Sequence, residues 1–202
     1  MTKPMQLGFL ASHGGSSMRA ILAATQGGTL SAQPRILITN NGASAAADFA
    51  RGQGLTTRHI SAKTEGSPAA EDAAIAAALK DAGVTHVLLS GYLRKLGPTT
   101  LAAFPGHIIN VHPALLPSHG GKGMYGDFVH AAVLAAGEAV SGATIHVVDE
   151  EYDHGPTLAQ RAVPVEAGDT VETLRARVMA AEPVLFIETL QAIEARGGRV
   201  LP

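Results

Sequence analysis

The chain has 202 residues, of which 46% are hydrophobic, and its formal net charge at pH 7 is −2. This length fits one domain, and the hydrophobic content excludes a disordered chain. The small net charge and the aromatic content of 4% argue against nucleic-acid binding, and the absence of cysteine excludes disulfides and thiolate catalysis. No apolar run approaches the roughly 18 residues that cross a membrane. We therefore expect a cytoplasmic protein with neither nucleic acid nor membrane among its partners.

Short apolar runs alternate with helical segments through the first half of the chain. We predict five strands, at residues 6–11, 35–39, 57–60, 86–89 and 107–111. Capping residues and helical periodicity predict helices from Ser17 to Gly27, over residues 44–51 with Ser44 as N-cap, and from Ser67-Pro68 to Ala82. This alternation predicts an α/β fold, a Rossmann-like open and mostly parallel sheet with helices on both faces.

The pattern changes after Gly137. Residues 141–149 and 157–165 read as two extended segments joined by a turn-rich stretch, which predicts an antiparallel C-terminal strand pair. Residues 169–172 resemble a capping box, so we expect a last helix from there to Arg196, kinked at Pro183. Neither a repeat nor a linker interrupts the chain, and one domain is expected.

A Gly/Ser turn, residues 12–17, separates the first strand from the first helix. Backbone N–H groups at a helix N-terminus attract phosphate, and the hydroxyls of Ser16 and Ser17 add donors. The turn does not match G-x-G-x-x-G, and the second strand ends in Asn40-Asn41 with no acidic residue for a ribose diol. The residues therefore favour a monophosphate over a dinucleotide, although a tight turn without a ligand remains the alternative.

Asn110 and His112 alternate at the end of the fifth strand, so their side chains point the same way. An Asn amide can donate to a developing oxyanion, and a His can hold or pass a proton. Asp153, in the acidic turn of residues 150–156, could orient His112 and raise the pKa of that imidazole. The alternatives are structural polar groups and a solvated hairpin loop.

The remaining histidines receive lesser roles. His146 is expected on a strand that faces the presumed site, in a supporting position, whereas four others are expected to pack or to lie at the surface: His59, His86, His119 and His130. A metal site could be drawn from His112, His146 and Asp153, but no pair of histidines spaced i, i+4 supports it, and we expect no metal.

Several longer motifs accompany these residues: SGYLRKL from Ser90, N-x-HPALLP from Asn110, GGKGMYG from Gly120, SGATIHVVDEEYDHGP from Ser141 and VPVEAGDT from Val163. With the Gly/Ser turn, they make the chain resemble the glycinamide ribonucleotide formyltransferases along nearly its whole length. The resemblance implies transfer of a formyl group from 10-formyltetrahydrofolate, a cosubstrate, to the amine of glycinamide ribonucleotide in purine biosynthesis. It also implies a nucleotide-binding half, residues 1–105, and a catalytic and folate-binding half, residues 106–202, in a monomer or homodimer.

Residue by residue, the resemblance implies three groups of site residues. The catalytic residues would be Asn110, His112 and Asp153, with Asp153 holding His112 protonated. The nucleotide would be bound by Gly15, Ser16, Ser17 and Glu182. The folate would be bound by Leu93, Arg94, Lys95, Leu96, Asn110, Asp149, Glu150, Glu151, Tyr152 and Asp153.

The chain departs from the family pattern at a few positions. His107 stands where a basic residue often meets phosphate, and Pro68 falls near the position of a folate-contacting Arg. The same catalytic residues would also serve a formyltetrahydrofolate deformylase, or a formyltransferase acting on methionyl-tRNA or an amino sugar. A non-catalytic nucleotide-binding module is the alternative outside enzymes.

Overall fold

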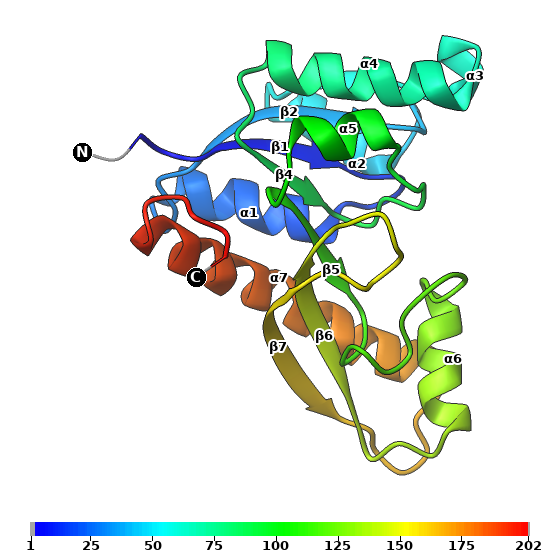
Figure 1. Ribbon diagram of the computed structural model, residues 1–202. Coiled ribbons are helices and arrows are strands. Elements are labelled where there is room, and N and C mark those ends of the chain that lie inside the picture. Colours follow the sequence, from blue (N-terminus) through cyan, green and yellow to red (C-terminus); the bar gives the residue numbers. More distant parts are fainter. Residues whose placement is uncertain (1–2, 202) are drawn as a thin grey trace.

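The computed structural model describes residues 3–201, which form one seven-stranded mixed sheet (Figure 1). The strand order is β3-β2-β1-β4-β5-β6-β7. The first five strands are parallel to one another, and β6 is antiparallel to both β5 and β7, so the predicted C-terminal antiparallel pair is present. The strands are β1 (Gln6–Leu10), β2 (Gln33–Thr39), β3 (Thr56–His59), β4 (His86–Leu89), β5 (Ile108–His112), β6 (Val140–Val147) and β7 (Thr157–Pro164).

The helices are α1 (Ser16–Gln26), α2 (Ala45–Gly52), α3 (Ala62–Glu65), α4 (Pro68–Asp81), α5 (Pro98–Ala103), α6 (Asp127–Ala135) and α7 (Val171–Ala195). The predicted N-caps are confirmed, because the hydroxyls of Ser44 and Ser67 accept backbone N–H groups of α2 and α4. At the start of α7, the reciprocal capping box joins Thr170 to Thr173. Pro183 lies inside α7, which continues to Ala195.

Three helices were not predicted: α3, α5 and α6. The first two have 4 and 6 residues, too short for helical periodicity to show. Helix α6 has 9 residues and follows the glycine-rich stretch from Gly120 to Gly126, whose loop signals mask its start.

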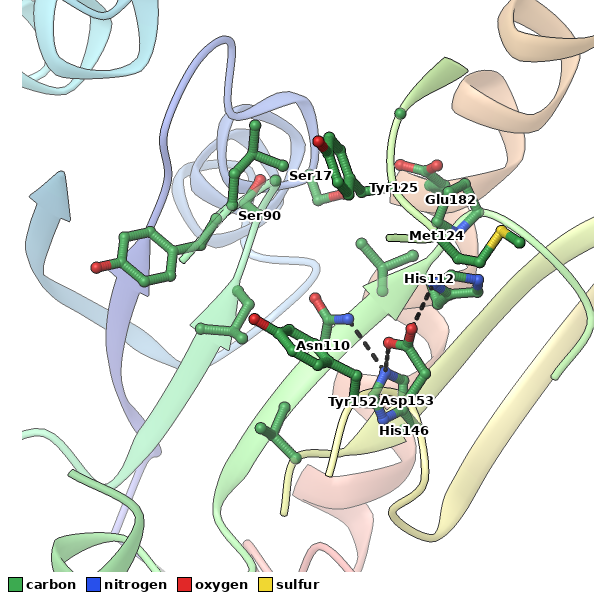
Figure 2. Close-up of a pocket in the computed structure, with 18 of the residues that line it drawn as sticks. Ser17, Ser90, Asn110, His112, Met124, Tyr125, His146, Tyr152, Asp153 and Glu182 are labelled. Atoms are coloured by element: carbon green, nitrogen blue, oxygen red, sulfur yellow. Dashed lines mark hydrogen bonds and ion pairs between the residues drawn. The ribbon is translucent and has the colours of Figure 1, made fainter. Parts of the chain in front are cut away.

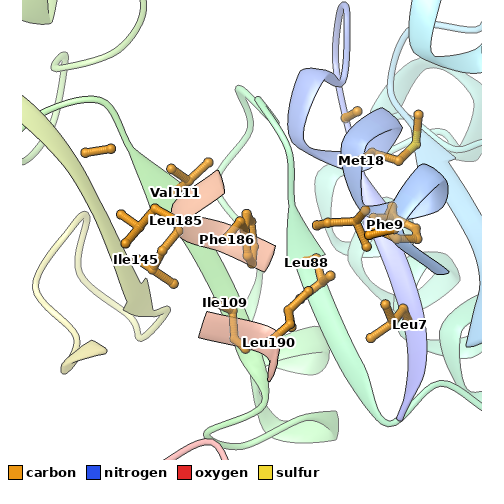
Figure 3. Packing of buried hydrophobic residues seen from close by; sticks show 14 of the residues in the cluster. Leu7, Phe9, Met18, Leu88, Ile109, Val111, Ile145, Leu185, Phe186 and Leu190 are labelled. Carbon is orange, nitrogen blue, oxygen red and sulfur yellow. The ribbon is translucent and has the colours of Figure 1, made fainter. Parts of the chain in front are cut away.

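Alternate side chains along the strands build two apolar cores, one on each face of the sheet. Leu7, Phe9 and Leu88 pack against α1 and α7 on one face, together with Phe186 of α7 (Figure 3). On the other face, the intervening strand residues pack against α4 and α5. Helices therefore cover both faces, which confirms the predicted layers.

Strand β1 lies between β2 and β4, so the chain leaves β1 and β4 toward opposite sides of the sheet. Open α/β sheets bind ligands at the carboxyl ends of strands beside such a reversal. The carboxyl ends of β1, β4 and β5 are therefore the place to look for a site. Within residues 3–201, no helix has the length and apolar character needed to cross a membrane.

Candidate active site

A cavity of about 660 Å³ opens at the carboxyl ends of β1, β4 and β5. It brings together nearly all the predicted site residues, from the β1–α1 turn, the segment after β4, the end of β5, the β6–β7 loop and α7: Gly15, Ser16, Ser17, Leu93, Arg94, Lys95, Leu96, Asn110, His112, Asp149, Glu151, Tyr152, Asp153 and Glu182. Glu150 is exposed and does not line the cavity, so its predicted folate contact finds no support. His107 and Pro68 also lie outside it.

Asn110 and His112 both line the cavity from β5, as their alternation predicts (Figure 2). The antiparallel register places His146 of β6 directly opposite Asn110. His146 Nδ1–H donates to the Val147 carbonyl at 3.0 Å, which leaves Nε2 to accept from the Asn110 amide nitrogen at 3.1 Å. This bond fixes the orientation of the Asn110 amide and leaves its second N–H free to donate to a ligand.

The imidazole of His112 is buried between two oxygens. Its Nε2 lies 2.9 Å from the carbonyl oxygen of His119, and its Nδ1 lies 3.4 Å from Asp153 Oδ2. A neutral ring with its proton on Nε2 satisfies the shorter contact, and a second proton on Nδ1 would face the carboxylate. The site is therefore built to accept a proton at Nδ1.

The pKa of His112 corrects the expectation of a protonated imidazole in the free protein. Burial lowers this pKa, and its effect outweighs the opposing effects of the Asp153 charge and the His119 carbonyl. Asp153 does act in the predicted direction, but it does not overcome desolvation. We conclude that His112 is neutral near pH 7 before substrate binds.

Asp153 is held as an anion by its neighbours. Burial acts to raise the pKa of Asp153, but the surrounding groups, among them the His112 imidazole and the Gly121 backbone N–H, lower it below its ordinary value. The Gly121 N–H donates to Asp153 Oδ2 at 3.0 Å, and His146 Nε2 lies 3.5 Å from Oδ1. The glycine-rich stretch after β5 is thus bonded to the carboxylate beside His112.

Backbone strain gathers at the same place. Among residues 3–201, the non-glycine residues with a left-handed backbone are His119 and Asp153, at φ 54° and 56°. Both contact the His112 ring through oxygens. Strained conformations persist where surrounding structure enforces them, and they concentrate at active sites.

The β1–α1 turn is a rigid concave end of the cavity. Gly15 has φ 63°, and a Cβ there would lie 3.0 Å from the Cβ of Ala46, so only glycine fits. Ser17 is buried, and its hydroxyl has no hydrogen-bond partner within the described chain. Arg19 donates to the carbonyls of Gly14 and Ala45 at 2.8 and 2.7 Å, which ties the turn to α2.

The segment after β4 and the β6–β7 loop face each other across the cavity. The ammonium of Lys95 lies 5.5 Å from the ring centre of Tyr152, a cation–π contact between the two segments. Leu93 and Tyr152 are both exposed and supply apolar walls. Asp149 accepts the backbone N–H of Glu151, which shapes the loop.

Several further residues line the cavity, although the sequence analysis gave them no role in the site. The glycine-rich stretch contributes Lys122, Met124 and Tyr125, and α6 contributes His130, which was expected to pack. His130 was missed because α6 was not predicted, so no helical face could be assigned to it. Within residues 3–201, no group of three or more His, Cys, Asp or Glu side chains is arranged to hold a metal ion.

Comparison with known proteins agrees with this geometry. The family model described as formyl transferase matches residues 5–190. A relative from Vigna unguiculata, phosphoribosylglycinamide formyltransferase, chloroplastic, is 40% identical over 93% of this chain, which spans 60% of that relative. Phosphoribosylglycinamide formyltransferase of Mycobacterium tuberculosis strain H37Rv is 35% identical over 98% of this chain and 89% of its own length.

A solved structure has the same fold. Glycinamide ribonucleotide transformylase 1 from Symbiobacterium toebii superimposes with a TM-score of 0.89 at 34% identity, covering 96% of this chain and 89% of that one. The likeness extends over both halves of the sheet, because nearly the whole chain is covered. From its sequence, its fold and its cavity, the chain belongs to the formyl transferase family.

Proposed function

We propose that this chain transfers the formyl group of 10-formyltetrahydrofolate to the amine of glycinamide ribonucleotide, a step in the synthesis of purines. The observation that carries this proposal is the convergence of Asn110, His112 and Asp153 in one cavity beside the β1–α1 turn. The names of the plant and mycobacterial relatives support the same reaction.

The nucleotide occupies the end of the cavity that α1 and α7 form. The N–H groups of Gly15, Ser16 and Ser17 bind its phosphate, and the unpartnered Ser17 hydroxyl adds a donor. Glu182 of α7 contacts the rest of the nucleotide. Burial raises the pKa of Glu182 to about 7, and a substrate group that donates to the carboxylate would compensate that burial.

The folate occupies the other end, between Leu93–Leu96 and Asp149–Asp153. The exposed Leu93 and Tyr152 would pack against the pterin, and backbone polar groups would bind its edge. The halves 1–105 and 106–202 do not divide strictly by ligand, because each contributes residues to both ends of the cavity.

The chemistry begins with the amine held against the formyl carbon, so that a bimolecular step becomes an oriented one. Attack gives a tetrahedral intermediate whose oxyanion accepts the free N–H of Asn110. Neutral His112 takes up at Nδ1 the proton that the amine loses, relayed by water because both ring nitrogens face protein oxygens, and Asp153 stabilises the imidazolium so formed. His112 then returns the proton to N10 of the folate as the carbon–nitrogen bond breaks.

The formyl group on N10 is already activated, so this mechanism uses no metal. We further propose small-molecule substrates as the main partners, a monomer or homodimer as the assembly, and the cytoplasm as the location. The cysteine-free composition fits a reducing compartment.

One assay separates the proposal from its alternatives: the absorbance change of formyl-folate turnover, with and without glycinamide ribonucleotide. Turnover that requires the nucleotide supports the proposal. Turnover without any amine would identify a deformylase, and turnover only with methionyl-tRNA or an amino sugar would identify another transferase. No turnover with any of these would favour a binding module.

A further inference from the structure

His130 is a buried histidine whose Nδ1 has no hydrogen-bond partner among the described residues. Its side chain lines the cavity from α6, and the residue is 1% exposed. Nδ1 is shielded from solvent and has no hydrogen bond within residues 3–201. Buried polar groups are almost always paired, so each unpaired one needs an explanation.

His86 shows what a structural histidine looks like in the same fold. It is also buried, at the amino end of β4 and therefore away from the cavity, but both of its ring nitrogens have partners. Nδ1 lies 2.8 Å from the hydroxyl of Thr85, and Nε2 lies 2.8 Å from the carbonyl of Gly198. The packing role expected for both histidines therefore fits His86 and does not account for His130.

The surroundings of His130 fix its protonation. Burial lowers the pKa of His130, and the Arg175 and His112 charges lower it further against the opposing Asp127. A proton on Nδ1 would be a buried donor with no acceptor, which is rarer in proteins than an unpaired acceptor. The neutral ring therefore carries its proton on Nε2, as a donor.

Two other polar side chains without hydrogen-bond partners within residues 3–201 line the same cavity, at its proposed nucleotide end. The Ser17 hydroxyl is buried and unpaired, and Glu182 is buried with no side-chain hydrogen bond within residues 3–201. In Figure 2, Glu182 and Ser17 lie in the upper part of the view, and Tyr152, the residue at the proposed folate end, lies lower. Three elements, α1, α6 and α7, thus direct unpaired polar groups at one region.

We infer that His130 is a further substrate-binding residue, whose Nε2–H donates to a neutral oxygen of the ribose or glycinamide part of the nucleotide. This inference rests on the proposed function. A neutral donor suits a hydroxyl or amide oxygen, and the phosphate already has the α1 N-terminus. His130 and His112 line the same cavity, so His130 lies on the side of the reacting end of the nucleotide.

The test compares His130→Leu, His130→Gln and the control His86→Leu. His130→Leu should raise the nucleotide's KM and calorimetric Kd by about 3- to 10-fold, the cost of one neutral hydrogen bond. The folate KM should stay within about twofold. His130→Gln keeps a donor near the Nε2 position and should lie closer to the parent chain.

Stability separates a binding role from a structural one. His130→Leu removes an unpaired polar group, so its Tm should equal or exceed that of the parent chain. His86→Leu breaks two buried hydrogen bonds and should lower the Tm without changing the nucleotide's Kd. A lowered Tm with an unchanged Kd in His130→Leu would overturn the inference. A parent chain that neither binds nor formylates the nucleotide would instead refute the proposed function.

Discussion

At the scale of single residues, the pKa values of groups in the cavity depend on the balance between burial and neighbouring charge. His112 is the clearest case, because burial lowers its pKa while Asp153 acts to raise it. Removing the Asp153 charge should therefore lower the pKa of His112 further. In the proposed mechanism the neutral imidazole is the competent form of the free enzyme, so the acid limb of kcat/KM reports this pKa.

Asp153→Asn should move that acid limb to lower pH, and it should reduce the plateau by about 10²-fold or more through loss of acid–base assistance. His112→Ala should be similarly severe, and the double variant little worse than either single one, because the two residues act as a unit. The measurement is kcat/KM against pH for the four proteins. Additive losses with an unmoved acid limb would falsify the coupled pair.

Burial shifts the pKa of Glu182 in the opposite direction from that of His112, and this shift makes the stability of the fold depend on pH. Its pKa rises from 4.5 to about 7 on folding, so the folded state binds more protons between these values. The contribution to stability is fully present below pH 4.5 and is lost as pH rises through 7. The loss is on the order of 3 kcal/mol.

Glu182→Gln removes this titration while it keeps the side-chain shape. We expect the variant to match the parent chain near pH 4.5 and to exceed its Tm by roughly 6–12 °C near pH 8.5. Thermal unfolding at the two pH values measures the difference. If the Tm difference between the variant and the parent chain were the same at both pH values, ionisation of Glu182 would not destabilise the fold, which would contradict the effect expected from its burial.

At the scale of elements, the β1–α1 turn is held in shape by contacts within the protein. Arg19 binds the Gly14 and Ala45 carbonyls, and its guanidinium lies 4.4 Å from the ring centre of Phe49 on α2. Ser12 and Ser90 connect the same turn to the segment after β4. The proposed nucleotide end and the proposed folate end of the cavity are therefore connected by the same hydrogen bonds.

Arg19→Gln should raise the nucleotide's KM by about 10-fold with a smaller change in kcat, because phosphate anchoring is mostly uniform binding. Arg51→Gln is the matched control, since Arg51 also donates to a backbone carbonyl, that of Gly42, but lies outside the cavity lining. Steady-state kinetics with varied nucleotide measure both. Equal effects of the two substitutions would show that the turn does not depend on Arg19.

At the scale of the whole molecule, three buried histidines make folding sensitive to acid. Burial lowers the pKa of His86, His112 and His130 below the ordinary 6.5. The unfolded chain binds more protons than the folded one as pH falls below 6.5, so stability present above this pH is lost as pH falls through the folded values.

His86→Gln should accordingly reduce the slope of stability against pH between 7 and 5, even though it lowers stability at pH 7. Urea unfolding at several pH values measures this slope in a Glu182→Gln background, which removes the opposing carboxyl. An unchanged slope would mean that His86 is not among the groups that cause acid sensitivity.

The fold was largely predictable because its signals are local. Apolar runs located all the strands to within one or two residues, and the capping hydroxyls of Ser44 and Ser67 marked two helix starts. Helix α6 was missed, because a glycine-rich stretch precedes it and no capping side chain marks its start. That omission removed His130 from the candidate site.

The sequence by itself determined the α/β class, the positions of the strands and the chemical types in the cavity. Asn110 and His112 share a face because strand geometry has a period of two residues. Only the tertiary structure decided that burial lowers the pKa of His112 and that Glu150 lies outside the cavity lining, because burial and loop direction depend on residues distant in the chain. The tertiary structure also decided the hydrogen-bond partners of the buried side chains. His146 pairs with Asn110, and Nδ1 of His130 stays unpaired within residues 3–201, because of how the strands and helices pack.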